Sequence, residues 1–93
     1  MSKVVLKGYV IVPVPDLSAV LDALQAHIDL TREEAGCLIF DVSQDPGQPN
    51  RLNVYEEFAS PEAFRSHQER AKSSHWGSVA ESAERHYHVT GLE

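Results

Sequence analysis

The sequence is short of cysteine, basic residues and long apolar runs, and each shortage excludes a class of protein. One cysteine cannot form an internal disulfide, which fits a reducing cytoplasm. Eight Lys and Arg residues stand against fourteen Asp and Glu residues, giving a net charge of −6. This charge disfavours nucleic acid and anionic membranes, because phosphate groups bind to basic surfaces. No segment approaches the roughly 18 apolar residues of a membrane span. We therefore expect a cytoplasmic protein with no nucleic acid or membrane partner.

Motifs that bind cofactors or metals are also missing. There is no Gly-rich phosphate loop and no dinucleotide fingerprint, so we expect no flavin or nicotinamide domain. His86 and His88 have a usable metal spacing with His75 upstream, but no third ligand stands at a telling interval. Cys37 is most simply a small buried hydrophobe, because no Cys-His or Ser-His arrangement is readable. We expect neither a metal nor a cofactor.

The length of the chain limits both its size and its stability. Its 93 residues have room for one domain, which we place at residues 1–93. Hydrophobic residues make up 42% and charged residues 24%, as in ordinary globular proteins. A domain this short buries only about 60–65% of the surface that its unfolded chain exposes. A lone monomer should therefore be marginally stable.

The first half of the chain alternates strand and helix patterns. β-Branched and aromatic residues predict a strand over residues 3–12. Asp16 predicts the N-cap of a helix that ends at Gly36. The apolar residues of this helix recur at helical spacing, at Leu17, Val20, Leu21, Leu24, His27, Ile28 and Thr31. Two further strands are predicted over residues 37–43 and 51–58, with a loop of turn residues over 45–50 between them.

The second half predicts a helix, a break, a short helix and a last strand. Ser60 predicts an N-cap, with Pro61 in the first helical position and Glu62 complementing the helix dipole. The apolar side of this helix consists of Ala63, Phe64, His67 and Ala71. We expect it to break at residues 72–74. A short helix should follow over Trp76, Val79, Ala80 and Ala83, and the last strand over residues 85–89.

The order β-α-β-β-α-(α)-β predicts a ferredoxin-like α+β fold. With right-handed crossovers, one antiparallel sheet carries the two main helices on one face, and strands 3–12 and 51–58 are central. Strand 3–12 is apolar on both faces, with Val4, Leu6, Val10 and Val12 on one and Val5, Tyr9 and Ile11 on the other. A sheet face in water should instead carry polar residues. We expect the helix-free face to pack on a second copy in a homodimer. The alternative is a central strand that is only locally apolar on both sides.

Three stretches of sequence carry a resemblance to a known family. They read Glu-Glu-Ala-Gly-Cys-Leu-Ile-Phe (33–40), Asn-Arg-Leu-Asn-Val-Tyr-Glu-Glu-Phe (50–58) and Ser-Pro-Glu-Ala-Phe-Arg-Ser-His (60–67). Their order and spacing resemble the antibiotic biosynthesis monooxygenase (ABM) family, including its quinol monooxygenase-like members. In that family Glu-Pro-Gly-Cys precedes a strand, the next strand reads aromatic-Glu-x-aromatic, and Ala-aromatic-x-x-His lies on a helix.

The resemblance implies a fold and a reaction. The fold is a dimeric α+β barrel, and the reaction is the oxidation of a quinol or polycyclic phenol by dioxygen without a bound cofactor. Ala35 stands where the family usually has proline, which affects only how the preceding helix ends. Haem-degrading members have an Asn on the first strand, and residues 3–12 contain none. We therefore do not expect haem.

Two histidines and one glutamate are the candidate catalytic residues. His27 and His67 both fall on the apolar sides of their predicted helices, which pack on the same sheet face. An imidazole placed there can take a proton from a phenol or quinol. Glu56 aligns with the family's strand glutamate and ranks above its neighbour Glu57. The alternatives are structural: imidazoles bonded to backbone, and a glutamate paired with Arg51, Lys7, Arg85 or a histidine.

Aromatic residues are the candidate substrate-binding residues. Flat polycyclic substrates stack on aromatic walls, and the candidates for such walls are Tyr55, Phe40, Trp76, Phe64 and Tyr9. Small domains also fill their cores with aromatic rings, so each ring has a structural alternative. The favoured function is a cofactor-independent monooxygenase acting on a small aromatic substrate with dioxygen. The alternatives are a non-catalytic small-molecule binding protein and a non-oxidative enzyme on the same fold.

Overall fold

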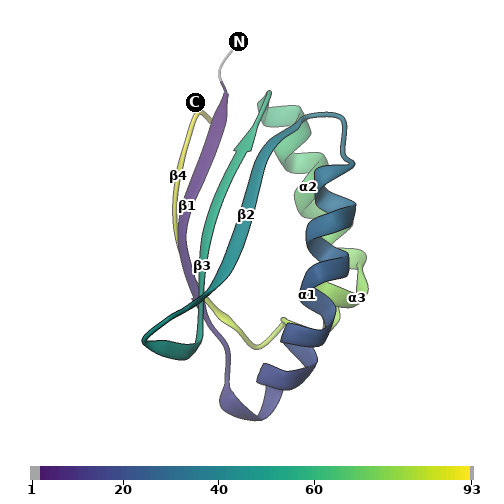
Figure 1. Ribbon diagram of the computed structural model, residues 1–93. Helices are drawn as coiled ribbons and strands as arrows, with labels where there is room; N and C mark the ends of the chain where they lie inside the picture. Colours follow the sequence, from purple (N-terminus) through teal and green to yellow (C-terminus); the bar gives the residue numbers. More distant parts are fainter. Residues whose placement is uncertain (1–2, 93) are drawn as a thin grey trace.

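The computed structural model describes residues 3–92 and shows one antiparallel sheet with helices on one face (Figure 1). The elements are β1 (Val4–Ile11), a 3-10 turn (Val14–Asp16), α1 (Leu17–Arg32), β2 (Cys37–Asp45), β3 (Gln48–Phe58), α2 (Pro61–Ser73), α3 (His75–Val79) and β4 (Glu84–Thr90). The strand order is β2-β3-β1-β4, so β1 and β3 are central as predicted. The predicted ferredoxin-like α+β fold is confirmed.

The hairpin between β2 and β3 is tighter than the sequence predicted. The predicted loop over residues 45–50 shrinks to Pro46 and Gly47, because the strands continue to Asp45 and resume at Gln48. The Asp45 carboxylate accepts a hydrogen bond of 3.0 Å from the Gly47 amide, which closes the turn. Pro49 is tolerated inside β3 because the pairing with β1 begins only at Arg51.

The two main helices begin in different ways. Ser60 caps α2 as predicted, since its hydroxyl accepts a hydrogen bond of 3.1 Å from the Ala63 amide. Asp16 lies at the N-cap position of α1, but its side chain accepts no hydrogen bond from the helix. Its carboxylate instead accepts a bond of 2.7 Å from the Ser82 hydroxyl. The predicted capping role of Asp16 is therefore wrong, because a residue far along the sequence competes for the carboxylate.

Gly36 has a different role from the predicted helix stop. Helix α1 ends at Arg32, and Gly36 lies at the end of the turn that leads into β2. A Cβ atom at position 36 would lie 2.3 Å from the Cβ of Ala63 in α2. Glycine is therefore required here for the close approach of α2 to the turn, not for the end of α1.

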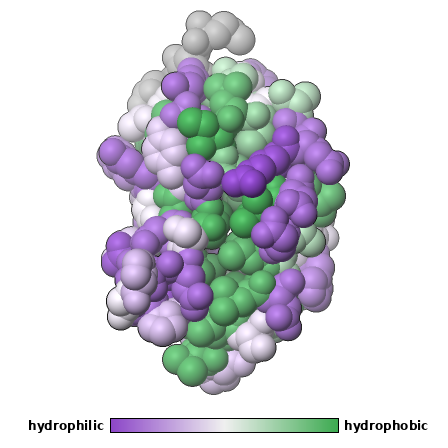
Figure 2. Space-filling model, viewed as in Figure 1, coloured by the Kyte–Doolittle hydropathy of each residue, from purple (hydrophilic) through white to green (hydrophobic). Residues whose placement is uncertain are grey.

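The two faces of the sheet differ in their surroundings. The face under the helices carries the buried core residues, which on the central strands are Val4, Leu6, Val10, Leu52, Val54 and Phe58. Glu56 occupies a position on this same face, between Val54 and Phe58. Figure 2 shows hydrophobic residues gathered along the middle of the viewed side, with hydrophilic residues flanking them. No helix within residues 3–92 covers the opposite face, where Val5, Tyr9 and Ile11 are partly exposed. The sheet therefore has one core position that holds a carboxylate.

Candidate functional site

A cavity of about 1060 Å³ lies between the helix-covered face of the sheet and the helices. This is close to the upper end of the range for small-molecule sites, about 300–1,000 Å³. The sheet contributes Leu6, Glu56 and Tyr87, and the helices contribute His27, Phe64, His67 and Trp76. Both candidate histidines and the candidate glutamate therefore line one cavity.

His67 lies on the buried side of α2, one turn after Phe64, and only 4% of its surface is exposed. Its Nδ1 is 3.0 Å from Oε1 of Glu34, and its Nε2 is 3.9 Å from Oε1 of Glu56. An ionised carboxylate only accepts hydrogen bonds, so this contact favours the tautomer with a proton on Nδ1 and a free lone pair on Nε2. Burial lowers the pKa of His67, and the Glu34 charge offsets part of that shift. The imidazole is therefore a neutral base whose free nitrogen faces Glu56.

Glu56 is a buried carboxyl group without a full set of partners. Within residues 3–92, its Oε1 has no hydrogen-bond partner. Burial, and then the charge of Glu34, raise the pKa of Glu56 to about 7. At neutral pH the group therefore exists in both protonated and ionised forms, so it can donate or accept a hydrogen bond.

Within residues 3–92, the cations that the sequence offered as partners for Glu56 form no bond with it, although Arg85 lines the same cavity. Arg51 lies over the Tyr9 ring on the helix-free face. Lys7 is one residue out of phase with Leu6, so it points to that same face. The Arg85 guanidinium donates to the carbonyl groups of Ala83 and Ala80. The His67 imidazole is the one candidate partner that approaches Glu56, and its distance of 3.9 Å is too long for a direct hydrogen bond.

His27 is a buried imidazole held between aromatic rings. It stacks on Trp76 with ring centroids 4.6 Å apart and an interplanar angle of 5°, and it meets Phe40 edge-on at 5.3 Å. Burial lowers the pKa of His27 to about 3, with smaller contributions from His67 and Arg70. An imidazole with so low a pKa is a weak proton acceptor. The geometry favours His27 as a wall of the cavity and His67 as the base.

The predicted aromatic walls divide between the two sheet faces. Trp76 and Phe64 line the cavity, and Phe40 lies behind it against both imidazoles. Tyr55 and Tyr9 lie on the helix-free face, where the Tyr55 hydroxyl donates to Glu57 and Tyr9 stacks on His86. The expectation that these two tyrosines line the cavity is wrong. Tyr55 adjoins Glu56 in a strand, so the two side chains point to opposite faces.

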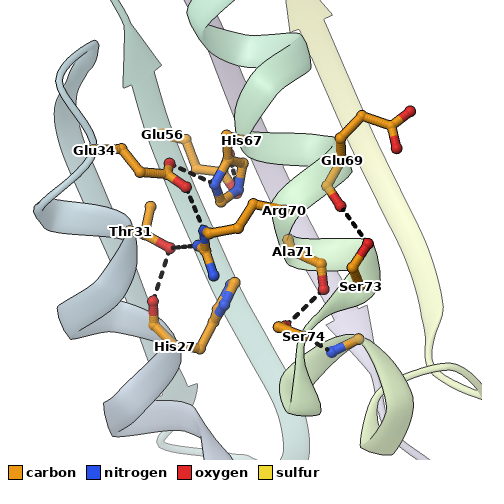
Figure 3. A network of polar contacts seen from close by, with 11 residues as sticks. His27, Thr31, Glu34, Glu56, His67, Glu69, Arg70, Ala71, Ser73 and Ser74 are labelled. Atoms are coloured by element: carbon orange, nitrogen blue, oxygen red, sulfur yellow. Dashed lines mark hydrogen bonds and ion pairs between the residues drawn. The ribbon is translucent and has the colours of Figure 1, made fainter.

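Several residues of the site were missed by the sequence analysis. Figure 3 shows Glu34, from the turn after α1, bonded to both His67 and Arg70 of α2. The spacing of His67 and Arg70 was an available signal, because residues three apart share a helix face. Tyr87 reaches the cavity from β4, and its alternation with Val89 was a second signal. Nothing in the sequence joins Glu34 to a helix that begins 27 residues later.

Two negative findings concern residues 3–92. This part of the chain contains no group of three His, Cys, Asp or Glu side chains arranged to hold a metal ion. Across the same residues, none of the helices has both the length and the apolar character needed to cross a membrane.

The sequence profile for antibiotic biosynthesis monooxygenases matches residues 6–79. The chain belongs to this family. A comparison with curated proteins finds no match. Solved structures of similar fold match nearly the whole chain. The similarity of fold therefore also covers residues outside the range 6–79.

Three of these structures show the extent of the likeness. MupZ from Pseudomonas fluorescens has a TM-score of 0.78 at 20% identity, covering 98% of this chain and 73% of its own. A Nitrosomonas europaea protein, provisionally named an antibiotic biosynthesis monooxygenase, has a TM-score of 0.75 at 20% sequence identity. The match covers 97% of this chain and 94% of that protein. A Bacteroides thetaiotaomicron protein of unknown function, described as a possible oxidoreductase, has a TM-score of 0.75 at 19% sequence identity. The match covers 96% of each chain. At these identities the likeness shows the fold alone.

Proposed function

We propose that this ABM protein is a cofactor-independent monooxygenase that oxidises a quinol or polycyclic phenol with dioxygen. One observation carries the proposal, namely the gap of 3.9 Å between His67 Nε2 and Glu56 Oε1 at the cavity wall. An oxygen atom can lie at hydrogen-bond distance, about 2.8 Å, from both atoms. A substrate hydroxyl group in this position, reached by a small movement of the buried Glu56 carboxyl group, would donate to the free nitrogen of His67 and supply the partner that Glu56 Oε1 lacks within residues 3–92.

The chemistry starts with a proton transfer. The hydroxyl proton passes to His67 Nε2, and Glu56 in its protonated form donates to the oxygen that becomes negative. The aromatic anion gives one electron to dioxygen, which forms a radical pair of substrate and superoxide. Their union forms a C–O bond, and the peroxide oxygen takes a proton. Cleavage of the O–O bond with loss of the ring proton leaves a carbonyl group and one water molecule, so one oxygen atom enters the product.

The cavity wall suits a flat substrate. The stacked His27 and Trp76 rings are nearly parallel, at 5°, and both residues line the cavity. Aromatic substrates bind to such surfaces by offset stacking. The neutral state of His27 supports this role, because an uncharged ring does not need water around it.

We also propose that the protein is a cytoplasmic homodimer joined through the helix-free face. Val5, Tyr9 and Ile11 are only partly buried there, and Ile39 of β2 is 37% exposed. A second sheet would remove these residues from water. Sedimentation should then give twice the 10.3 kDa chain mass, with an interface on the order of 1,200–2,000 Å². A monomer at micromolar concentration would contradict the dimer.

Dioxygen consumption tests the proposed reaction. A panel of hydroquinones and polycyclic phenols is supplied under metal-free conditions, and His67→Ala should lower turnover about 10²–10⁴-fold. His75→Ala is the matched control, since His75 is exposed and does not line the cavity. Unchanged rates in His67→Ala, in His27→Ala and in the double variant would exclude a histidine base.

A lack of turnover by the wild-type protein would contradict the monooxygenase proposal. Stabilisation by the same compounds in thermal unfolding would then support the alternative of a non-catalytic small-molecule binding protein. Conversion of a substrate without dioxygen uptake would instead support a non-oxidative enzyme.

A further inference from the structure

Glu34 bonds two side chains of α2 next to the cavity, those of His67 and Arg70. It lies in the turn between α1 and β2, and 21% of its side chain is exposed. One carboxylate oxygen, Oε1, is 3.0 Å from His67 Nδ1, and the other, Oε2, accepts a hydrogen bond from Arg70 Nε. Both oxygens are therefore in use, and the carboxylate has one orientation that satisfies both partners.

Arg70 ties this carboxylate to the end of α1. Its Nη2 donates to the Thr31 hydroxyl at 2.9 Å, and that hydroxyl donates to the His27 carbonyl oxygen at 2.7 Å. Thr31 is fully buried, so the anchor lies inside the protein. Arg70 stands one turn after His67 on α2, and one helix face presents both side chains to Glu34 (Figure 3).

The charged and titratable groups around His67 come from four elements. Glu34 lies in the turn before β2, Glu56 on β3, Arg70 on α2 and His27 on α1. Among these, only Glu34 lies at hydrogen-bond distance from the imidazole, and it contacts Nδ1 alone. The other nitrogen, Nε2, faces Glu56 and the gap in which the proposed substrate hydroxyl lies.

We propose that Glu34, held by Arg70, is a positioning residue that keeps His67 protonated on Nδ1 and free on Nε2. This inference rests on the proposed function, because the free Nε2 is the atom that takes the substrate proton. A histidine with the opposite tautomer would present an N–H group to the substrate hydroxyl and could not act as its base. Hydrogen-bonded carboxylates set the tautomer of catalytic imidazoles elsewhere by this same physical rule.

A purely structural ion pair between the α1 end and α2 is the competing explanation. Loss of such a pair would lower stability without changing the protonation of His67. The Glu34→Gln variant separates the two explanations, because it keeps the shape of the side chain and removes its charge. Glu33→Gln is the matched control, since it makes the same charge change at the exposed neighbouring position.

The kinetic test compares these variants with the wild-type protein on a quinol that it oxidises. Glu34→Gln should lower kcat about 10–100-fold with little change in KM, since Glu34 lies behind the imidazole and does not line the cavity. The pH at which activity appears should also fall, because the charge of Glu34 raises the pKa of His67. Glu34→Asp should restore part of the rate. Equal rates and pH profiles in Glu34→Gln and Glu33→Gln would overturn the proposal.

Nitrogen-15 NMR of the imidazole tests the proposal without any activity. In the wild-type protein at pH 7, His67 should show the neutral form with hydrogen on Nδ1. In Glu34→Gln the Nε2–H form should appear, or the pKa of His67 should fall, or both. An Nε2–H form in the wild-type protein, or an unchanged spectrum and pKa in the variant, would overturn the proposal. This result stands even when no quinol is oxidised, so failure of the positioning role and failure of the proposed reaction are distinguishable.

A second variant covers the case in which Glu34→Gln does not fold. Arg70→Gln leaves Glu34 in place and removes the anchor to Thr31. The Nδ1–H form of His67 should then become a mixture of both tautomers, because the carboxylate is free to turn away. A single unchanged Nδ1–H form would show that Arg70 does not hold Glu34 in position and would overturn that part of the proposal.

Discussion

Two neighbouring glutamates of β3 show how the two faces of one sheet give the same side chain different partners and a different pKa. Glu56 lies under the helices and Glu57 on the helix-free face, and their side chains are 7% and 13% exposed. The Tyr55 hydroxyl and the Lys3 ammonium group are bonded to Glu57, and these partners hold the pKa of Glu57 below its ordinary value. Among the residues that the structure describes, one oxygen of Glu56 has no partner, and burial raises the pKa of Glu56 to about 7.

The comparison teaches that exposure alone does not decide the state of a carboxyl group. The two side chains have similarly low exposure, but Glu56 has a layer of helices above it and Glu57 has only its strand neighbours and a lysine. Desolvation disfavours the charged form, whereas a cation and a hydroxyl donor favour it. From adjacent positions, the two faces therefore give one carboxyl group that is partly protonated at neutral pH and one that is ionised there.

The largest expected effect is the loss of folding stability in acid that the buried His27 on the helix-covered face causes. Its pKa is about 3 in the folded protein and 6.5 when unfolded, so below pH 6.5 the unfolded chain binds a proton that the folded chain does not. Stability from this group is therefore lost as the pH falls. Between pH 6.5 and 4, wild type should lose about 3 kcal/mol relative to His27→Gln. Urea unfolding at both pH values checks this, with His75→Gln as the control for loss of one surface imidazole.

The Glu56 and Glu57 variants should give stability slopes of opposite sign. The pKa of Glu56 is raised from 4.5 to about 7, so its contribution is fully present below pH 4.5 and is lost as the pH rises through 7. Glu56→Gln should therefore gain about 2 kcal/mol over wild type between pH 5 and 7. The depressed pKa of Glu57 means that its contribution is present above pH 4.5 and is lost in acid. Glu57→Gln should lose stability at neutral pH and approach wild type as the pH falls.

Unfolding curves of these two variants decide whether the comparison holds. Slopes of the same sign for Glu56→Gln and Glu57→Gln would contradict it, because both carboxyl groups would then share one environment.

The smallest expected effect sharpens the comparison at a single hydrogen bond. Tyr55→Phe removes the hydroxyl that donates to Glu57 and leaves the helix-covered face untouched. The pKa of Glu57 should rise toward its ordinary value, and the pKa of Glu56 should not move, because the two groups lie on opposite faces. Carbon-13 NMR titration of the carboxyl groups measures both values at once. A shift of Glu56 as large as that of Glu57 would show that the faces are not independent.

Local features of the fold were predictable from the sequence. The Ser60 cap and Pro61 mark the start of α2 through contacts within four residues. Helical spacing placed His27 and His67 on buried helix sides, because periodicity alone decides which residues share a face. Alternation along β3 likewise places Tyr55 and Glu56 on opposite faces, so the sequence itself excludes Tyr55 from the cavity that Glu56 lines.

Contacts between distant segments depended on the tertiary structure. Asp16 has the residue type of a helix cap, yet its carboxylate binds Ser82, 66 residues away. Gly36 has the residue type of a helix stop, yet it is required because Ala63 lies against it. No local pattern predicts these pairings, since they depend on how α2 and the segment before β4 pack on the rest.

The sequence by itself therefore determined the order of the elements, the burial of both histidines and the placement of Glu56 and Tyr55 on opposite faces of the sheet. These properties follow from periods of 2 and 3.6 residues, which a single segment contains in full. Only the tertiary structure decided that Glu34 meets His67 and that Glu56 Oε1 has no partner in the described part of the chain. The protonation of a group depends on the charges and the water within a few ångströms of it. Those surroundings come from segments that are far apart in the chain and are brought together only by folding.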